Sequence, residues 1–309
     1  MATIAWIGLG HMGIPMSSNM LKAGYTVRGF DIDLLALRRA KAAGIQTVNS
    51  IREAVSGAVA VFTMLPAGPD VDQVLTSHDG VFANAAPDTI IIDCSTIGID
   101  YAKKIHDAAR QVNVAFVEAP VSGGTEGAAA GNLTFMLGGD HRYIDRAKEL
   151  LDPMGEFMSH VGGAGAGQAA KVVNNLIMGV SVTINSEATF LAQRLGLDLK
   201  NLYDIVLHSS GDNWSFRKWN PAPGVVPESP ASHGYVAGFK TWLLAKDLHL
   251  AIEAGESVGV RLATAEAAHG LLRKHADTGG ADLDCSSLIL GLGKSAHLGG
   301  LTGATRSAK

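Results

Sequence analysis

The sequence predicts two domains: an α/β domain with a mostly parallel sheet, followed by an all-α domain. Through about the first 160 residues, short apolar runs alternate with segments whose apolar residues recur at helical spacing. The runs are nearly continuous, as expected of parallel strands that helices cover on both faces. After Gly167 only the helical spacing continues. We therefore expect domains over residues 1–163 and 164–309, joined near residues 162–167.

Apolar runs and the residues that end them predict the elements of the first domain. The expected strands are residues 3–7, 26–30, 59–65, 89–93, 114–118 and 134–137. The expected helices are residues 12–23, 34–43 and 101–113. Gly24, Gly44 and Pro66 each stand directly after such an element, where a helix or a strand ends.

The second domain begins with one long helix candidate, residues 168–195. It has few helix breakers and is apolar on most faces, which is typical of a buried helix. Residues 199–209, 239–258 and 262–274 have helical spacing as well. Residues 220–238 are rich in proline and glycine, and we expect a loop there.

Composition excludes several classes of partner. The formal net charge is −4 without a long basic run, so neither nucleic acid nor an anionic membrane is expected to bind. No apolar stretch is long enough for a membrane span, and the N-terminus lacks a secretory signal pattern. Two distant cysteines indicate reduced core thiols in a cytoplasmic protein. The 11 histidines show no metal-ligand spacing, so no metal site is expected.

Residues 8–13 read Gly-Leu-Gly-His-Met-Gly, directly after the first predicted strand and at the start of a helix. In this context Gly8 permits a tight turn, Gly10 leaves room for a pyrophosphate, and Gly13 lets the helix pack closely on the strand. The helix N-terminus would present its N–H groups to the phosphates. The motif predicts a dinucleotide-binding domain of Rossmann type.

Asp31 indicates which dinucleotide binds. It lies 23 residues after Gly8, at the end of the second predicted strand, where a carboxylate accepts hydrogen bonds from ribose hydroxyls. A 2′-phosphate would meet like charge there, and the next two residues supply no cation. We therefore expect NAD. Arg28 and Arg38 are near in sequence and keep NADP as the less favoured alternative.

A second glycine turn, Ser122-Gly123-Gly124, follows the strand that ends at Glu118. Ligands of open α/β sheets bind beyond the carboxyl ends of strands. Adjacent glycines let successive N–H groups point at one anion, and Ser122 adds a hydroxyl donor, so the turn could hold a carboxylate. From the residues alone, an ordinary turn is equally consistent with the pattern.

Two lysines lie within apolar helical stretches. Lys171 shares a helix face with Asn175, and partial burial would lower a lysine's pKa toward neutrality and make it a usable acid or base. Asn175 could then orient a substrate oxygen. The alternative is a lysine whose amine reaches water. For Lys246 and Asp247, the default interpretation is a surface ion pair on an amphipathic helix.

Five motifs together resemble the signatures of the β-hydroxyacid dehydrogenase family, in the same order and over nearly the whole chain. They are residues 7–16, 93–96, 122–124, 167–175 and 246–248. The resemblance implies that Lys171 is the catalytic acid/base, that Asn175 places the substrate, and that Ser122, Gly123 and Gly124 bind its carboxylate. Lys246 would lie near the nicotinamide with Phe239 beside it. The implied cofactor-binding residues are Gly8, Gly10, His11, Met12, Gly13, Asp31, Leu65, Pro66, Thr96, Phe239, Lys246 and Asp247.

The loop before Phe239 is similar to that of the branch that oxidises 3-hydroxyisobutyrate to methylmalonate semialdehyde. Its marks are Asn213-Trp214 and residues 220–225, 230–231 and 234–235. The alternatives are oxidation of L-serine or 3-hydroxypropionate, and reduction of tartronate semialdehyde. The resemblance implies that Trp214 and Trp219 contribute to the substrate site, although Trp219 stands where relatives often carry tyrosine. It also implies a homodimer or homotetramer.

Other classes fit less well. The chain lacks the Tyr-x-x-x-Lys of short-chain dehydrogenases, a zinc-ligand set, and the histidine pattern of 6-phosphogluconate dehydrogenase. A non-catalytic binding module on the same fold should lack the lysine and carry an added basic tail. Lys171 is present, and the mixed C-terminal residues 305–309 are no such tail.

Overall fold

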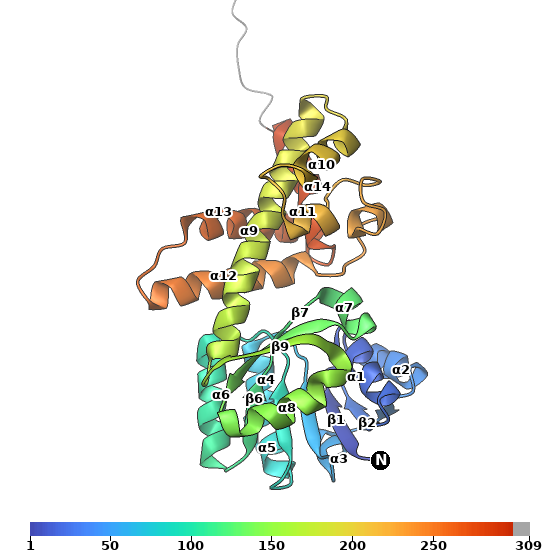
Figure 1. Cartoon of the computed structure of the whole chain (residues 1–309), viewed down its shortest axis with the longest axis vertical. Helices are drawn as coiled ribbons and strands as arrows, with labels where there is room; N and C mark the ends of the chain where they lie inside the picture. Colours follow the sequence, from blue (N-terminus) through green and yellow to red (C-terminus); the bar gives the residue numbers. More distant parts are fainter. Residues whose placement is uncertain (299–309) are drawn as a thin grey trace, which may run out of the picture. The chain divides into compact units, whose positions relative to one another are not determined.

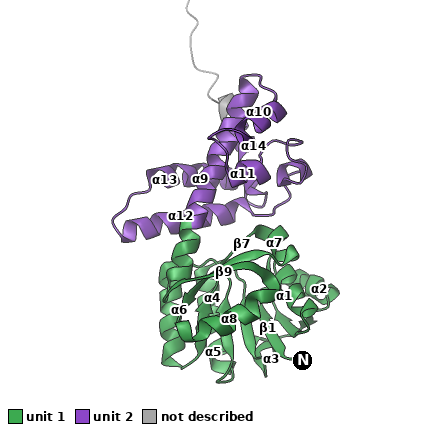
Figure 2. Ribbon diagram, viewed as in Figure 1, with its two compact units in different colours: residues 1–173 green, residues 174–309 purple. Residues whose placement is uncertain are grey.

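The computed structural model describes residues 1–298, so the C-terminal residues 305–309 lie outside it. The chain forms two compact units, Met1–Val173 and Asn174–Lys309 (Figure 2). The division falls inside the long helix α9 (Ala166–Arg194), whose first two turns belong to unit 1.

Unit 1 contains a nine-stranded sheet within the described residues. Strands β1 (Thr3–Ile7), β2 (Thr26–Phe30), β3 (Gln46–Thr47), β4 (Ala60–Thr63), β5 (Ile90–Asp93) and β6 (Ala115–Glu118) are parallel, in the order β3-β2-β1-β4-β5-β6. Strand β8 (Leu133–Gly139) pairs antiparallel with β6 and with β7 (Val121–Ser122), and parallel with β9 (Gly155–Gly162). The prediction of a mostly parallel sheet is confirmed. In sheets with this order, dinucleotides bind at the point where the order reverses, between β1 and β4.

Helices cover both faces of the sheet (Figure 1). Alternate residues of β1 point to opposite faces, so Ile4 and Trp6 belong to one core while Ala5 and Ile7 belong to the other. The first core is closed by α1 (Gly13–Lys22), α2 (Leu34–Ala42), α7 (Gly124–Ala130) and α8 (Ile144–Leu151). The second is closed by α3 (Ile51–Val55), α4 (Gly68–Thr76), α5 (Val81–Asn84) and α6 (Ile99–Gln111).

Unit 2 is helical, as the sequence predicts. After α9 come α10 (Leu199–Leu207), α11 (Trp214–Lys218), α12 (Thr241–Ser257), α13 (Ala263–His275) and α14 (Leu288–Leu298). The core includes Val182 of α9, Leu248 of α12 and Leu272 of α13. The segment between α11 and α12 is the expected loop, with one short 3₁₀ turn at Pro230–His233.

Two hydrogen bonds to one side chain move the start of α12 away from the prediction. Helix α12 begins at Thr241, two residues later than expected, because the N–H groups of Gly238 and Phe239 both donate to Oδ2 of Asp284 (3.0 Å). The sequence pattern also missed β3 and β7, which have two residues each, and the edge strand β9. Such short or half-exposed strands carry little hydrophobic periodicity.

One face of α9 contradicts the expectation that this helix is buried. Ile177, Ile184, Leu191 and Leu195 are each 53–66% exposed in the single chain. They recur at intervals of seven and four residues, so they form one apolar stripe along the helix. We call these four residues the α9 stripe.

The two cysteines behave as predicted. Cys94 and Cys285 are free and buried, and burial raises the pKa of both thiols. Within residues 1–298, no helix combines the length and the hydropathy needed to cross a bilayer.

Gly13 and Gly10 of the first loop differ in the space around them, which makes a matched test. A Cβ on Gly13 would lie 2.0 Å from the carbonyl oxygen of Gly8, whereas a Cβ on Gly10 would have no atom within 4 Å. We predict that Gly13→Ala lowers the free energy of unfolding by about 2 kcal/mol or more and that Gly10→Ala leaves it nearly unchanged. Urea denaturation of both variants measures this, and equal stabilities would contradict the packing.

Candidate active site

The glycine loop and the end of β2 meet through one carboxylate. The N–H of Leu9 donates to Oδ2 of Asp31 (2.6 Å), and the N–H of Asp33 donates to Oδ1 (2.8 Å). Helix α1 starts directly after this loop, with no side-chain cap and no acidic residue in its first turn. No side chain of the first turn of α1 therefore competes for its N–H groups and positive dipole end, and the open space at Gly10 admits a phosphate. The residues present fit a dinucleotide.

The carboxyl ends of β4 and β5 lie at the same edge of the sheet as the glycine loop after β1. Thr63 at the end of β4 pairs in register with Ile7 and with Asp93, so the loops after β1, β4 and β5 start side by side. The N–H of Leu65 donates to Oγ of Ser95 (2.8 Å), which joins the β4 and β5 loops. The predicted cofactor residues His11, Met12, Pro66 and Thr96 lie in these three loops, each at least partly exposed.

The second glycine turn follows β7, which lies three strands beyond β5 in the sheet order. Ser122 is the last residue of β7, and Gly123 and Gly124 follow with φ of 135° and 64°. These left-handed angles favour glycine, and they bring successive N–H groups of the turn toward one side.

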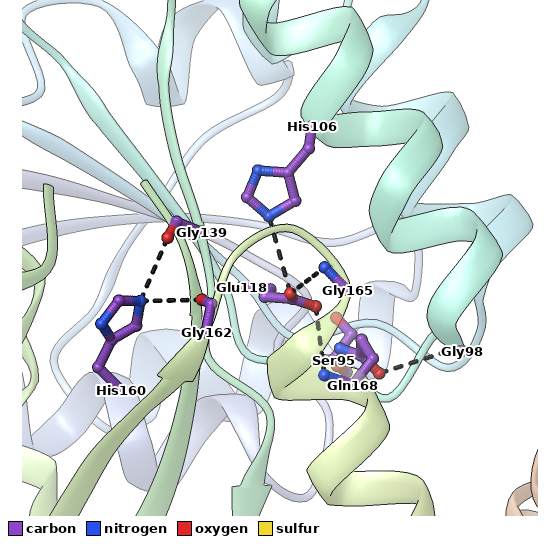
Figure 3. A network of polar contacts seen from close by, with 9 residues as sticks. All are labelled: Ser95, Gly98, His106, Glu118, Gly139, His160, Gly162, Gly165 and Gln168. Atoms are coloured by element: carbon purple, nitrogen blue, oxygen red, sulfur yellow. Dashed lines mark hydrogen bonds and ion pairs between the residues drawn. The ribbon is translucent and has the colours of Figure 1, made fainter. Parts of the chain in front are cut away.

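The start of α9 is fastened to β6 by a buried carboxylate (Figure 3). Glu118, the last residue of β6, has no exposed surface. Its Oε1 accepts from the N–H of Gly165 (2.6 Å), and its Oε2 accepts from the N–H of Gln168 (3.3 Å). The otherwise unpaired N–H groups that precede and open the helix thus find an anion.

The side chain of Gln168 fastens the same turn to the loop after β5. Its Nε2 donates to the carbonyl of Ser95 (2.9 Å), and its Oε1 accepts from the N–H groups of Ile97 (3.0 Å) and Gly98 (3.3 Å). Lys171 follows within one turn of α9 and is 8% exposed, so the predicted partial burial of this lysine is confirmed.

Two glycines allow this close approach of helix and sheet. A Cβ on Gly138 of β8 would lie 2.2 Å from Oε1 of Glu118 and 2.6 Å from the backbone nitrogen of Gly167. A Cβ on Gly167 would lie 2.5 Å from the carbonyl oxygen of Met136. Neither position accepts a side chain without a shift of backbone atoms.

Burial dominates the electrostatics around Glu118. It raises the pKa of Glu118 to about 7, although the hydrogen bonds from Gly165 and Gln168 act in the opposite direction. Nε2 of His106, on α6, lies 3.8 Å from Oε1 of Glu118, and burial and then Arg110 lower the pKa of this histidine to about 4. Near neutral pH the histidine is therefore uncharged, and the glutamate is close to its titration midpoint.

Within unit 2, Asp247 organises the predicted residues of α12 and α9. Nδ2 of Asn175 donates to Oδ2 of Asp247 (2.5 Å), and Nζ of Lys246 lies 3.2 Å from Oδ1. Asp247 is 3% exposed, so the expectation of a surface ion pair is wrong. Oδ1 of Asn175 accepts from Nδ2 of Asn174 (2.9 Å), and Phe239 packs on the unit 2 core.

The two tryptophans lie at the ends of α11 and contact one another. Their rings form a T-shaped pair with centroids 5.3 Å apart, and Trp214 is 55% exposed. Helix α11 is held by α9, because Nδ2 of Asn185 donates to Oδ1 of Asn213 (3.0 Å) and to Oγ of Ser215 (2.7 Å).

Glu118 and Gln168 were not predicted as functional residues. The available signals were a carboxylate that ends a fully buried strand, and an amide one helical turn before Lys171. Neither signal shows which backbone groups the side chain would meet.

The fold and these loops define an NAD-binding dehydrogenase. The family model of the NAD-binding domain of 6-phosphogluconate dehydrogenase matches residues 3–163. The model of the NAD-binding domain of NADP-dependent 3-hydroxyisobutyrate dehydrogenase matches residues 165–292. The chain belongs to the β-hydroxyacid dehydrogenase family, and it is an NAD-dependent enzyme of that family.

Three relatives illustrate the similarity. An NAD-dependent L-serine dehydrogenase of Pseudomonas aeruginosa is 48% identical over 83% of this chain and 86% of its own. A 3-hydroxyisobutyrate dehydrogenase of the same species is 40% identical over 93% and 97%. The structure of Mycobacterium tuberculosis 3-hydroxyisobutyrate dehydrogenase with L-serine has a TM-score of 0.85 at 43% identity, covering 94% of this chain and 99% of the other.

The raised pKa of Glu118 predicts a pH-dependent contribution to stability. An acid whose pKa is higher in the folded state stabilises fully below its unfolded pKa, and this stabilisation is lost as pH rises through the folded pKa. The free energy of unfolding of the wild type, minus that of Glu118→Gln, should therefore fall by about 3 kcal/mol from below pH 4.5 to above pH 7. The depressed pKa of His106 has the opposite effect but is present in both proteins. Urea titrations across this range measure the difference, and a difference that rises with pH would contradict the assignment.

Proposed function

We propose that the enzyme oxidises the alcohol β to the carboxylate of a small hydroxy acid, with 3-hydroxyisobutyrate to methylmalonate semialdehyde as the first candidate. The observation that carries the proposal is the buried Lys171, which lies directly after the turn of α9 that Gln168 fastens to the loop after β5. Burial disfavours an ammonium ion, so such a lysine is suited to accept a hydroxyl proton.

Each step has a residue of suitable chemistry. Lys171 accepts the proton of the substrate hydroxyl. The amide of Asn175 has two N–H bonds, one of which Asp247 takes, and the other donates to the substrate oxygen. Ser122 and the N–H groups of Gly123 and Gly124 bind the substrate carboxylate. NAD, when bound, accepts the hydride from the carbinol carbon.

The predicted cofactor residues are assigned to separate parts of the dinucleotide. We assign the pyrophosphate to the loop from Gly8 to Gly13 and the adenosine ribose to Asp31. Leu65, Pro66 and Thr96 line the path of the cofactor, and Lys246, Asp247 and Phe239 serve its nicotinamide end. In this proposal residues 1–163 form the dinucleotide-binding domain, which also holds the substrate carboxylate, and residues 164–309 form the substrate and oligomer domain, which also serves the nicotinamide.

The group at C2 distinguishes the candidate substrates. The paired rings of Trp214 and Trp219 supply an apolar surface that fits the methyl group of 3-hydroxyisobutyrate. An aromatic face also attracts a cation, which favours the ammonium of L-serine as the second candidate. The relative named as an L-serine dehydrogenase supports that second candidate as well.

We also propose a cytoplasmic homodimer or homotetramer. The reduced state of Cys94 and Cys285 suits a reducing compartment. The α9 stripe supports the oligomer, because contiguous exposed apolar patches are typical of subunit contacts.

Activity measurements test the role of Lys171. We predict that Lys171→Met lowers kcat for 3-hydroxyisobutyrate oxidation by about 10³-fold, because the proton acceptor is lost. NADH formation is followed at about pH 9 with 3-hydroxyisobutyrate, L-serine, 3-hydroxypropionate and glycerate.

The matched control is Lys41→Met, which removes an exposed lysine of the same unit and should leave kcat unchanged. NADH binding by Lys171→Met, measured by fluorescence, shows that the variant is folded. Full activity of Lys171→Met would refute the mechanism. A preference of the wild type for L-serine would keep the mechanism and change the substrate.

The oligomer proposal is tested at the centre of the α9 stripe. We predict that Ile184→Lys shifts the protein toward the monomer in light scattering after size exclusion, because a charge enters an apolar contact. Gln193→Lys is the control, since helical geometry places it on the opposite side of α9. A monomeric wild type would contradict the proposal.

A further inference from the structure

We propose that Gln168 is a positioning residue for catalysis: its side-chain amide holds the first turns of α9, and with them Lys171, in register with the loop that carries Thr96. The inference rests on the proposed role of Lys171. All of the residues that carry it lie within unit 1, Met1–Val173.

The contacts of Gln168 are directed at one loop (Figure 3). Its side chain reaches the carbonyl of Ser95 and the N–H groups of Ile97 and Gly98, which flank Thr96 on both sides. Gln168 has no exposed surface, so water does not compete for these bonds. The backbone groups on both sides of Thr96 are therefore hydrogen-bonded to the side chain of Gln168 on α9.

These three hydrogen bonds require an amide side chain. The carbonyl of Ser95 needs a donor, while the N–H groups of Ile97 and Gly98 need an acceptor, and one neutral amide supplies both. A methionine of similar length supplies neither, and a carboxylate lacks the donor. The residue type is thus matched to the loop rather than to the apolar packing of the helix.

A second anchor limits the remaining motion of the helix. Glu118 accepts from the N–H groups of Gly165 and Gln168, which hold the backbone of the first turn to β6. The close packing around Gly138 and Gly167 leaves no room for the helix to move closer to the sheet. With its backbone fixed at β6 and its side chain fixed at the β5 loop, Gln168 sets the place of Lys171 one turn later.

Misplacement of a reacting group by about 1 Å can reduce a rate by about 100-fold. We therefore expect Gln168→Met to lower kcat by about 10- to 100-fold. The KM for the hydroxy acid should change by less than about threefold, because the residues proposed to bind its carboxylate are untouched. The Kd for NADH should rise, because the loop that carries Thr96 loses its bonds to Gln168, so kcat is compared at saturating NAD. The primary deuterium isotope effect on kcat should increase, since the chemical step becomes slower.

Hydrogen exchange provides a readout that is independent of turnover. In the cofactor-free protein, amide exchange in a peptide spanning residues 96–99 should accelerate by about tenfold or more in Gln168→Met, because Ile97 and Gly98 lose their acceptor. Gln73→Met, at an exposed glutamine of α4, is the matched control and should change neither exchange nor kcat.

A merely structural role predicts a different pattern. Gln168→Met would then be less stable, but kcat per NADH-binding site and the isotope effect would equal those of the wild type. That result would overturn the inference. If Gln168→Met does not fold, Gln168→Glu keeps the acceptor and removes the donor to Ser95, and it should still lower kcat by at least about fivefold. A Gln168→Glu enzyme with the wild-type kcat would overturn the inference equally.

Lys171→Met is measured in parallel to separate the two proposals. An active Lys171→Met enzyme would refute the proposed function, whatever the Gln168 variants do. An inactive Lys171→Met enzyme, together with Gln168→Met that behaves like Gln73→Met, would refute the positioning role alone.

Discussion

The buried carboxylate of Glu118 is the interaction on which the arrangement of unit 1 depends. It ends β6 and accepts the N–H groups that open α9, so the long helix starts at a defined place on the sheet. Burial makes ionisation of this side chain costly, and the N–H donors at the start of α9 offset part of that cost. The absence of a side chain at Gly138 and Gly167 is part of the same constraint, since the two backbones could not otherwise approach.

Unit 2 uses a second buried carboxylate in a similar way. Asp247 holds the amide of Asn175 and the ammonium of Lys246, so residues of α9 and α12 share one charge-assisted cluster. Asp284 acts similarly just before α12 begins, because its carboxylate accepts hydrogen bonds from the N–H groups of Gly238 and Phe239. In each case, one buried acidic side chain holds a helix that carries a proposed site residue. It does so by accepting hydrogen bonds from groups of that helix or of the residues just before it.

These anchors also explain why the proposed chemistry belongs on α9. A proton-transfer residue needs a fixed position and partial burial, and both are easier to achieve on a helix than on a loop. The cofactor loops, in contrast, require open backbone and small residues, as the unobstructed space at Gly10 illustrates. The proposed site thus combines a helix for the reacting lysine with glycine loops for its ligands.

The sequence by itself determined the fold class, the glycine loop with Asp31, and the positions of Lys171 and Asn175, because these depend on local periodicity and on motifs of fixed spacing. Ends of elements depended on distant partners, as with Asp284 at the start of α12, and a local pattern does not contain them. Only the tertiary structure decided that Lys246 pairs with a buried Asp247 and that α9 exposes an apolar stripe. Only the tertiary structure, likewise, brought Glu118 and Gln168 to the start of α9, because hydrogen bonds between residues 47 to 73 positions apart follow from packing rather than from neighbouring residues.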